Sequence, residues 1–135
     1  MPKLTIGLVL PDVLGTYGDD GNALVLRQRA RLRGIDAEVL PITLADPVPA
    51  SCDIYTLGGA EDYAQRLATR HLTQYPGMQE AAAKGAPVLA ICGQVPTEEI
   101  GTSFFQEVDN DALFSDVAVF TATVTSANQM PQLLE

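Results

Sequence analysis

Apolar residues in the first two-thirds of the chain form short runs that are separated by longer amphipathic segments. The first run, residues 4–10, is almost continuously apolar, which is typical of a strand covered on both faces of its sheet. Pro11 ends this run, because proline cannot donate to a strand ladder. Similar runs bounded by proline or glycine predict three further strands, at 37–40, 52–57 and 87–91.

Helical periodicity fills most of the intervals between these runs. It predicts helices over 23–33, 61–71 and 76–84, the first with Asn22 as its N-cap and Gly34 just beyond its end. Because strands and helices alternate along the chain, we predict an α/β fold. Its form is a three-layer, doubly wound, mostly parallel sheet of about five strands.

The composition changes after Cys92. Residues 93–135 hold seven acidic residues and no Lys or Arg, whereas residues 1–92 hold ten acidic and eight basic residues. In this acidic tail the pattern predicts a short helix over 109–116, a fifth strand over 117–124 and a last helix capped by Ser126. Since no flexible linker marks the change, we predict a single domain over 1–135.

The net charge of the chain narrows its possible partners. The 135 residues carry a formal charge of −9 at pH 7. Such a chain is repelled by phosphate backbones and anionic lipid, so we expect neither nucleic acid nor a membrane surface as a partner. No apolar run approaches the ~20 residues that span a bilayer, and the first run lacks a cleavage site, so we predict a cytoplasmic protein.

The few cysteine and histidine residues limit cross-links and metal sites. Cys52 and Cys92 set no disulfide framework, and both are expected to be reduced in the cytosol. The single histidine, His71, joins no cluster with zinc spacing. We therefore predict no metal and no cofactor.

The sharpest candidate for chemistry is a strand that ends in a cysteine, Pro87-Val88-Leu89-Ala90-Ile91-Cys92-Gly93. A nucleophile elbow begins in this way, with the reactive side chain at the strand's carboxyl end and backbone N–H groups close by to hold an oxyanion. A thiol in that place can form a thioester with the side-chain carbonyl of glutamine, provided that a base makes the thiolate. A buried structural cysteine at a strand end is the alternative, and the pattern alone favours it.

Two glycine-rich loops follow other predicted strands. Gly58-Gly59, before Ala60-Glu61-Asp62, lets the backbone approach a ligand and can present paired N–H groups, although a tight strand-to-helix turn explains the same residues. The loop Gly15-Thr16-Tyr17-Gly18-Asp19-Asp20-Gly21-Asn22 is no phosphate loop, because GK[ST] is missing and its aspartates repel phosphate. A polar turn before a helix accounts for its glycines but not for the full string.

Together these three strings resemble the GatD-type glutamine amidotransferase subunits of lipid II isoglutaminyl synthase, in the cobyric-acid-synthase-like branch of class I amidotransferases. The resemblance covers residues 4–92, and Tyr17-Gly18-Asp19-x-Gly21-Asn22 is fairly specific to this family. It implies a flavodoxin-like fold, Cys92 as the nucleophile that attacks glutamine, and an oxyanion site near Gly58, Gly59 and Gly93. It also implies a Mur-ligase-like partner of the MurT type, which would use the released ammonia to amidate the D-glutamate of lipid II.

The sequence departs from this family after Cys92. The family continues with a glycine-rich elbow and a helix and supplies its catalytic histidine much later, whereas here Gln94-Val95-Pro96 follows Gly93 and no histidine comes after it. Pro96 lacks an N–H and disfavours helix at the residue before it, so it would disrupt an elbow helix near its start. His71 precedes Cys92, where the family does not place its base, and we predict a solvated position for it at a helix end.

The acidic tail resembles a second family. The string Gly93-Gln94-Val95-Pro96-Thr97-Glu98-Glu99-Ile100-Gly101-Thr102, with Phe104-Phe105-Gln106-Glu107, is similar to the pyrimidine-binding domain of thiamine-diphosphate enzymes such as acetolactate synthase and pyruvate oxidase. This resemblance covers residues 86–135. In that family the glutamate that activates the cofactor lies well upstream, and the diphosphate-binding domain is separate. Neither is present here, so thiamine chemistry is not expected.

Two family patterns therefore meet at the shared strand 86–91, which suggests a chimera. Packing two unrelated halves against each other costs about 1–3 kcal/mol per poor contact, against a total stability of about 5–15 kcal/mol. One interpretation is a glutaminase subunit that is impaired because the half with the catalytic histidine is absent. The alternative is a catalytically inactive hybrid α/β domain.

Overall fold

The structure is a computed structural model that describes residues 3–16, 18–84, 91–105, 107–116 and 118–133. Its residues group into two compact units, Met1–Val88 (unit 1) and Leu89–Glu135 (unit 2), and each is considered by itself. The predicted fourth strand at 87–91 falls almost wholly on residues 85–90, outside the described residues, and Ile91 is not in a strand.

Unit 1 is built on a parallel sheet of three strands, β1 (Leu4–Val9), β2 (Ala37–Ile42) and β3 (Ile54–Leu57), in the order β2-β1-β3. The first three predicted strands are thus confirmed. β2 runs on through Pro41 to Ile42, although the sequence predicted an end at Leu40. A proline is tolerated there because β2 is an outer strand of the described sheet.

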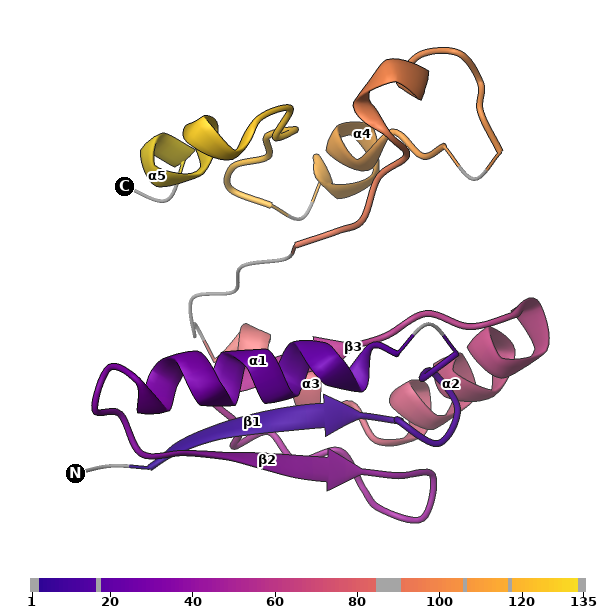
Figure 1. The fold of residues 1–135 in the computed structure, drawn as a ribbon. Coiled ribbons are helices and arrows are strands. Elements are labelled where there is room, and N and C mark those ends of the chain that lie inside the picture. Colours follow the sequence, from indigo (N-terminus) through magenta and orange to yellow (C-terminus); the bar gives the residue numbers. More distant parts are fainter. Residues whose placement is uncertain (1–2, 17, 85–90, 106, 117, 134–135) are drawn as a thin grey trace. The chain divides into compact units, whose positions relative to one another are not determined.

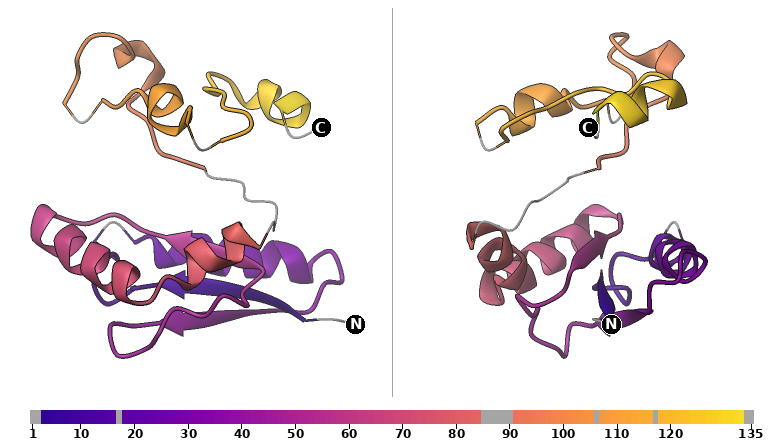
Figure 2. Two further views of the ribbon diagram at one scale, coloured as in Figure 1. Left: turned by 180° about the vertical axis from the view of Figure 1, so that it is seen from behind. Right: turned by 90° about the vertical axis from the view of Figure 1, so that its left-hand side faces the viewer.

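Helices cover both faces of this sheet. α1 (Asp20–Arg31) lies on one face, whereas α2 (Asp62–Gln74) and α3 (Gly77–Ala83) lie on the opposite face (Figures 1 and 2). The three layers and the parallel strands confirm the predicted α/β, doubly wound class. The described residues supply three of the roughly five strands that the sequence predicted.

The core explains why the first apolar run is continuous. Ile6 and Leu8 of β1 pack with Ala23 of α1, whereas Val9 belongs to a second buried cluster that includes Ala68 of α2. Successive strand residues point to opposite faces, so a strand covered on both faces needs apolar residues at every position.

The two ends of α1 show one wrong and one confirmed prediction. The N-cap position belongs to Asp19 rather than Asn22, because the N–H of Asn22 already bonds to the Asp19 carbonyl, at 3.0 Å, in the first turn. Gly34 follows the helix with φ of 76°, the left-handed conformation predicted for a glycine just beyond a helix end.

Unit 2 consists of short helices joined by irregular segments in its described part. These helices are η1 (Thr97–Glu99), α4 (Asn110–Phe114), η2 (Ala127–Gln129) and α5 (Met130–Leu133). Asp109 caps α4 by accepting a hydrogen bond from the Ala112 N–H at 3.0 Å, and Ser126 forms a reciprocal capping box with Gln129. The predicted short helix within 109–116 and the Ser126 cap are therefore confirmed.

The predicted fifth strand at 117–124 is wrong for its described residues, 118–124, which form no strand. A strand must exchange backbone hydrogen bonds with a neighbour, and the described part of unit 2 contains no second strand to supply them. Val119 and Phe120 are accordingly exposed. Among the described residues, no helix is both long enough and apolar enough to cross a bilayer.

His71 lies in the last turn of α2, as predicted, but the prediction that it is solvated is wrong. Only 7% of its surface is exposed, and its Nε2 lies 2.9 Å from the backbone oxygen of Asp46. Because a carbonyl oxygen only accepts, the ring must donate from Nε2. The ring also contacts Tyr75, with 4.8 Å between ring centroids. His71 thus ties α2 to the loop after β2.

Replacing His71 by alanine should lower the free energy of unfolding by about 2–4 kcal/mol, because it removes a buried ring and the hydrogen bond to Asp46. His71→Phe, which keeps a ring of similar size, should cost only about 1–2 kcal/mol. Urea unfolding followed by tyrosine fluorescence measures both. All four tyrosines precede residue 76 and the chain has no tryptophan, so this signal reports on unit 1. An alanine variant as stable as the parent would mean that His71 is solvated after all.

Candidate functional site

The carboxyl ends of β1 and β3 form the place where a sheet of this topology binds ligands. From β1 the chain passes through α1 to β2 on one side, and from β2 it returns to β3 on the other side of β1. Open α/β sheets bind ligands in the crevice at such a switch point. Here the loop that leads to α1 and the Gly58-Gly59 turn border it.

Gly58 is packed too closely for any side chain. A Cβ atom at this position would lie 2.1 Å from the backbone oxygen of Leu14 and 2.7 Å from both Cβ and Oδ2 of Asp19. The turn after β3 therefore touches the loop after β1 directly. A tight turn explains a glycine here, as the sequence allowed, but the close approach of two loops at the switch point is what requires it.

Gly59 presents its N–H to the same neighbour. This N–H donates to Oδ2 of Asp19 over 3.0 Å, although the two residues are 40 positions apart. This bond was not predicted from the sequence, which indicated Asn22 as the helix cap and assigned Asp19 no partner. The available signal was an aspartate directly before a helix, a position at which the carboxylate often accepts hydrogen bonds from backbone N–H groups.

A mainly apolar cavity of about 360 Å³ adjoins the two glycines. Its lining comes from the β3 end, α2 and Leu14, and includes Leu57, Gly58, Gly59, Gln65, Ala68, Thr69 and Leu72. The Gln65 side chain is fixed by a 2.6 Å hydrogen bond from its Nε2 to the Ala60 carbonyl. The unit therefore combines N–H groups, a carboxylate and an apolar hollow at one end of its sheet.

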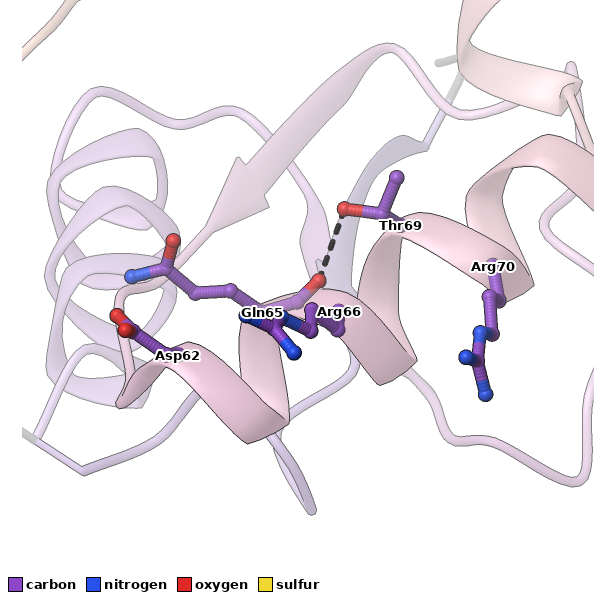
Figure 3. Close-up of a pocket in the computed structure, with 5 residues that line it drawn as sticks. All are labelled: Asp62, Gln65, Arg66, Thr69 and Arg70. Atoms are coloured by element: carbon purple, nitrogen blue, oxygen red, sulfur yellow. Dashed lines mark hydrogen bonds between the residues drawn. The ribbon is translucent and has the colours of Figure 1, made fainter.

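A second hollow, of about 410 Å³, lies along α2 and is lined by residues of that helix alone, Asp62, Gln65, Arg66, Thr69 and Arg70 (Figure 3). Thr69 in it donates its hydroxyl to the Gln65 carbonyl at 2.8 Å, which is ordinary helix-surface bonding. We place the candidate site at the glycines rather than here, because the first hollow lies at the end of β3 whereas the second is lined by one helix alone.

Cys92 and Gly93 belong to unit 2, whereas Gly58 and Gly59 belong to unit 1. Cys92 and Gly93 are both exposed, and residues 91–96 form neither strand nor helix. Gln94 instead donates to the Val108 carbonyl at 2.6 Å, and Asn110 donates to the Gly93 carbonyl at 3.4 Å. The strand–turn–helix of a nucleophile elbow is therefore not formed by the described residues around Cys92.

The described residues of unit 2 include no histidine that could act as a base for Cys92. Within this part of the chain no hydrogen bond reaches its thiol, and both cysteines are unpaired. The one histidine belongs to unit 1, with Nε2 bonded to Asp46. The described residues contain no group of three or more His, Cys, Asp or Glu side chains that could hold a metal. Pro96 lies directly before η1, so the first helical residue after Cys92 is Thr97.

Comparison with known proteins supports two resemblances. The chain is 40% identical over 95 residues to the GatD subunit of the glutamine-hydrolyzing lipid II isoglutaminyl synthase of Staphylococcus aureus, which corresponds to 69% of this chain and 39% of that protein. YdaP of Bacillus subtilis, whose name describes a thiamine pyrophosphate-containing protein, is 52% identical over 58 residues, 43% of this chain and 10% of its own. The mitochondrial acetolactate synthase catalytic subunit of Aspergillus candidus is 34% identical over 55 residues, 41% of this chain and 8% of its own.

The chain thus spans well under half the length of each of these relatives. The GatD match covers 69% of this chain and the YdaP match covers 43%. These two shares add up to more than the whole chain, so the two matched segments overlap. The sequence profile of the CobB/CobQ-like glutamine amidotransferase domain matches residues 5–96, which include all of the three-stranded sheet except Leu4, both glycines and Cys92. The chain therefore belongs to the family of CobB/CobQ-like glutamine amidotransferase domains.

Proposed function

We propose that this chain is a glutaminase-type subunit that releases ammonia from glutamine, with Cys92 as its nucleophile. The observation that carries the proposal is the family match over 5–96, which spans both the glycine turn after β3 and the cysteine. The exposed Cys92 thiol is accessible to a substrate. Gly58, Gly59 and Gly93 supply backbone N–H groups of the kind that bind an oxyanion.

The proposed reaction converts glutamine and water into glutamate and ammonia. The Cys92 thiolate attacks the side-chain carbonyl carbon, and a tetrahedral oxyanion forms. As it collapses, the C–N bond breaks, and the nitrogen leaves as ammonia after taking up a proton. Water then hydrolyses the thioester, which gives glutamate and restores the thiol. Each step needs a group that moves a proton between sulfur, nitrogen and water.

We propose further that this activity is impaired. No histidine follows Cys92 in the given sequence. An elbow helix would begin just after Cys92, but there Gln94 donates to the Val108 carbonyl and the Gly93 carbonyl accepts from Asn110. A cysteine without a base is present mostly as the unreactive thiol at neutral pH. Slow acylation is therefore expected rather than rapid turnover.

The partner and final acceptor are inferred from the relative. Because the Staphylococcus aureus protein is a subunit of lipid II isoglutaminyl synthase, we infer a Mur-ligase-like partner of the MurT type that would transfer the ammonia to the D-glutamate of lipid II. Binding of a purified ligase subunit, measured by calorimetry, tests this inference independently of glutamine hydrolysis.

An inactive hybrid domain is the second candidate, and the overlapping matches favour it. A chain with an amidotransferase front half and a thiamine-enzyme tail, joined near 86–91, would retain Cys92 without the remainder of either site. The boundary between the two units, after Val88, falls in the same stretch. Unit 2 also exposes large apolar side chains, among them Phe105, Leu113, Val119 and Phe120, as expected of a segment separated from its original neighbours.

A chloromethyl ketone analogue of glutamine should distinguish the two candidates. We expect slow labelling of Cys92 that glutamine suppresses and that Cys92→Ser abolishes, as measured by peptide mass spectrometry. Cys52 is an internal control, because burial raises the pKa of its thiol and so lowers its reactivity. Labelling of Cys92 that glutamine does not suppress, or no labelling in a cooperatively folded sample, would favour the inactive hybrid.

A further inference from the structure

Helix α1 buries its small side chains and exposes its large ones. Only Ala23 and Ala30 of this helix are buried, and Ala23 packs with Ile6 and Leu8 of β1. The large apolar side chains in and just after the helix are exposed, namely those of Leu24, Val25, Leu26 and Leu32. A helix that covers a sheet ordinarily turns its large apolar residues toward the core. The pattern of α1 therefore indicates a second apolar contact on its outer side.

Val25 and Leu32 form one stripe on the outer face of α1. Side chains two residues apart on a helix point about 200° apart, so Val25 lies opposite Ala23 and Leu32 lies opposite Ala30. Both are exposed, Val25 by 55% and Leu32 by 75%. Leu32 follows the last helical residue but keeps helical backbone angles, and its N–H donates to the Gln28 carbonyl at 3.0 Å. Val25 and Leu32, the outer stripe, thus span about two turns of helix.

The outer stripe lies in a strongly basic segment of an acidic chain. Residues 21–35 contain four arginines and no acidic residue, although the whole chain carries −9. Arg29 lies four residues after Val25 and three before Leu32, which places it beside both on the helix surface. Among the described residues the one ion pair joins Lys3 to Glu38, so no acidic side chain there neutralises the arginines. The helix dipole explains cations near the C-terminus of α1 but not the apolar stripe beside them.

We propose that the outer face of α1 docks an acidic amphipathic helix of a partner protein. The apolar side chains of that helix cover Val25 and Leu32, and its carboxylates pair with Arg29 beside them. Gly21 lies one turn before Val25, and a Cβ atom there would meet nothing within 4 Å, so a second backbone can approach closely. This inference goes beyond the glutaminase proposal and does not rest on it, because it uses no residue of the candidate site.

Charge and apolar surface together favour this partner over two others. A second copy of α1 laid on the outer stripe would bring its own arginines against Arg29, and like charges across an interface oppose association. Nucleic acid would attract the arginines, but it offers no apolar side chains to cover Val25 and Leu32, and the net charge of −9 repels it. A helix with an apolar face and acidic flanks supplies both the cover and the charge.

Two synthetic peptides test the proposal on the full chain labelled with ¹⁵N. The acidic peptide has leucines at helical spacing with glutamates beside them, and the basic peptide has lysine in place of each glutamate. We expect the acidic peptide to move the amide resonances of Val25, Arg29 and Leu32. The basic peptide should bind at least about tenfold more weakly, because like charges oppose it. Added salt should weaken binding of the acidic peptide.

Substitutions on the outer face should weaken this binding without unfolding the chain, since each side chain is exposed. Val25→Gln combined with Leu32→Gln should raise the Kd of the acidic peptide at least about tenfold, because two apolar side chains are no longer covered. Arg29→Gln should raise it about threefold, as for one surface ion pair. Tyr63→Gln and Arg66→Gln are the matched controls. They change exposed residues of α2, on the opposite face of the sheet, and should leave the Kd unchanged.

Equal binding of the two peptides, or binding of neither, would overturn the proposal. Self-association of the chain that Val25→Gln with Leu32→Gln abolishes, as measured by sedimentation, would mean that a second copy covers the outer stripe instead. Movement of the acidic-tail resonances in the same variant, without peptide, would mean that the chain's own tail takes the place of a partner. Either result would overturn the proposal as well.

Discussion

Alanine in place of Gly58 is expected to lower the free energy of unfolding by about 3 kcal/mol or more, the upper range for an overpacked site. Its methyl carbon would lie 2.1 Å from the Leu14 carbonyl oxygen, well inside any van der Waals contact. That oxygen belongs to the backbone, and Leu14 is itself buried, with its N–H bonded to the Leu10 carbonyl at 2.8 Å. The clash cannot be relieved by turning a side chain, so one of the two loops must move.

Gly21→Ala is the matched control for this substitution. Gly21 lies in the first turn of α1, and a Cβ there would meet nothing within 4 Å. Because alanine favours helix over glycine, this variant should be as stable as the parent or up to about 1 kcal/mol more stable. Urea unfolding followed by tyrosine fluorescence compares the two variants. Equal stability of Gly58→Ala and the parent would contradict the close packing of the two loops at the switch point.

The central part of the fold was predictable because its signals are local. A strand covered on both faces must be apolar at every position, so residues 4–10 identify β1 without knowledge of its neighbours. Gly34 marks the end of a helix because glycine readily adopts the left-handed backbone conformation found there. Where a prediction depended on a distant partner it failed. Residues 118–124 alternate like a strand but have no neighbouring strand among the described residues of unit 2.

The candidate site shows the same division between local and distant signals. Gly58, Gly59 and Cys92 were proposed as site residues from short strings. The partner of Gly59 was not found, because Asp19 is 40 positions away and no pattern links the two. His71 was predicted to be solvated because it lies near a helix end, yet its environment is set by the Asp46 carbonyl, 25 positions earlier. The residues before Cys92 made a nucleophile elbow a candidate there. The residues after it make other bonds, because Gln94 donates to the Val108 carbonyl and Asn110 donates to the Gly93 carbonyl.

Ile6→Ala is expected to cost about 2–5 kcal/mol of unfolding free energy, the range for large-to-small changes in a packed core. Ile6 is fully buried in the central strand, among Leu8, Ala23 and Ile54. All the buried side chains of the described residues belong to unit 1. A cavity at Ile6 should therefore lower the stability of the cooperative part of the molecule, as measured by the urea midpoint of the tyrosine signal.

The same substitution at Ile91 is the matched control, and it addresses the predicted fourth strand. Ile91 is 78% exposed, so Ile91→Ala should change the unfolding free energy by no more than about 0.5 kcal/mol. A loss comparable with that of Ile6→Ala would mean that Ile91 is buried as the end of a strand, the arrangement a nucleophile elbow needs. With the expected small effect, the residue before Cys92 is confirmed as exposed. The strand end that a nucleophile elbow needs would then be absent at Ile91.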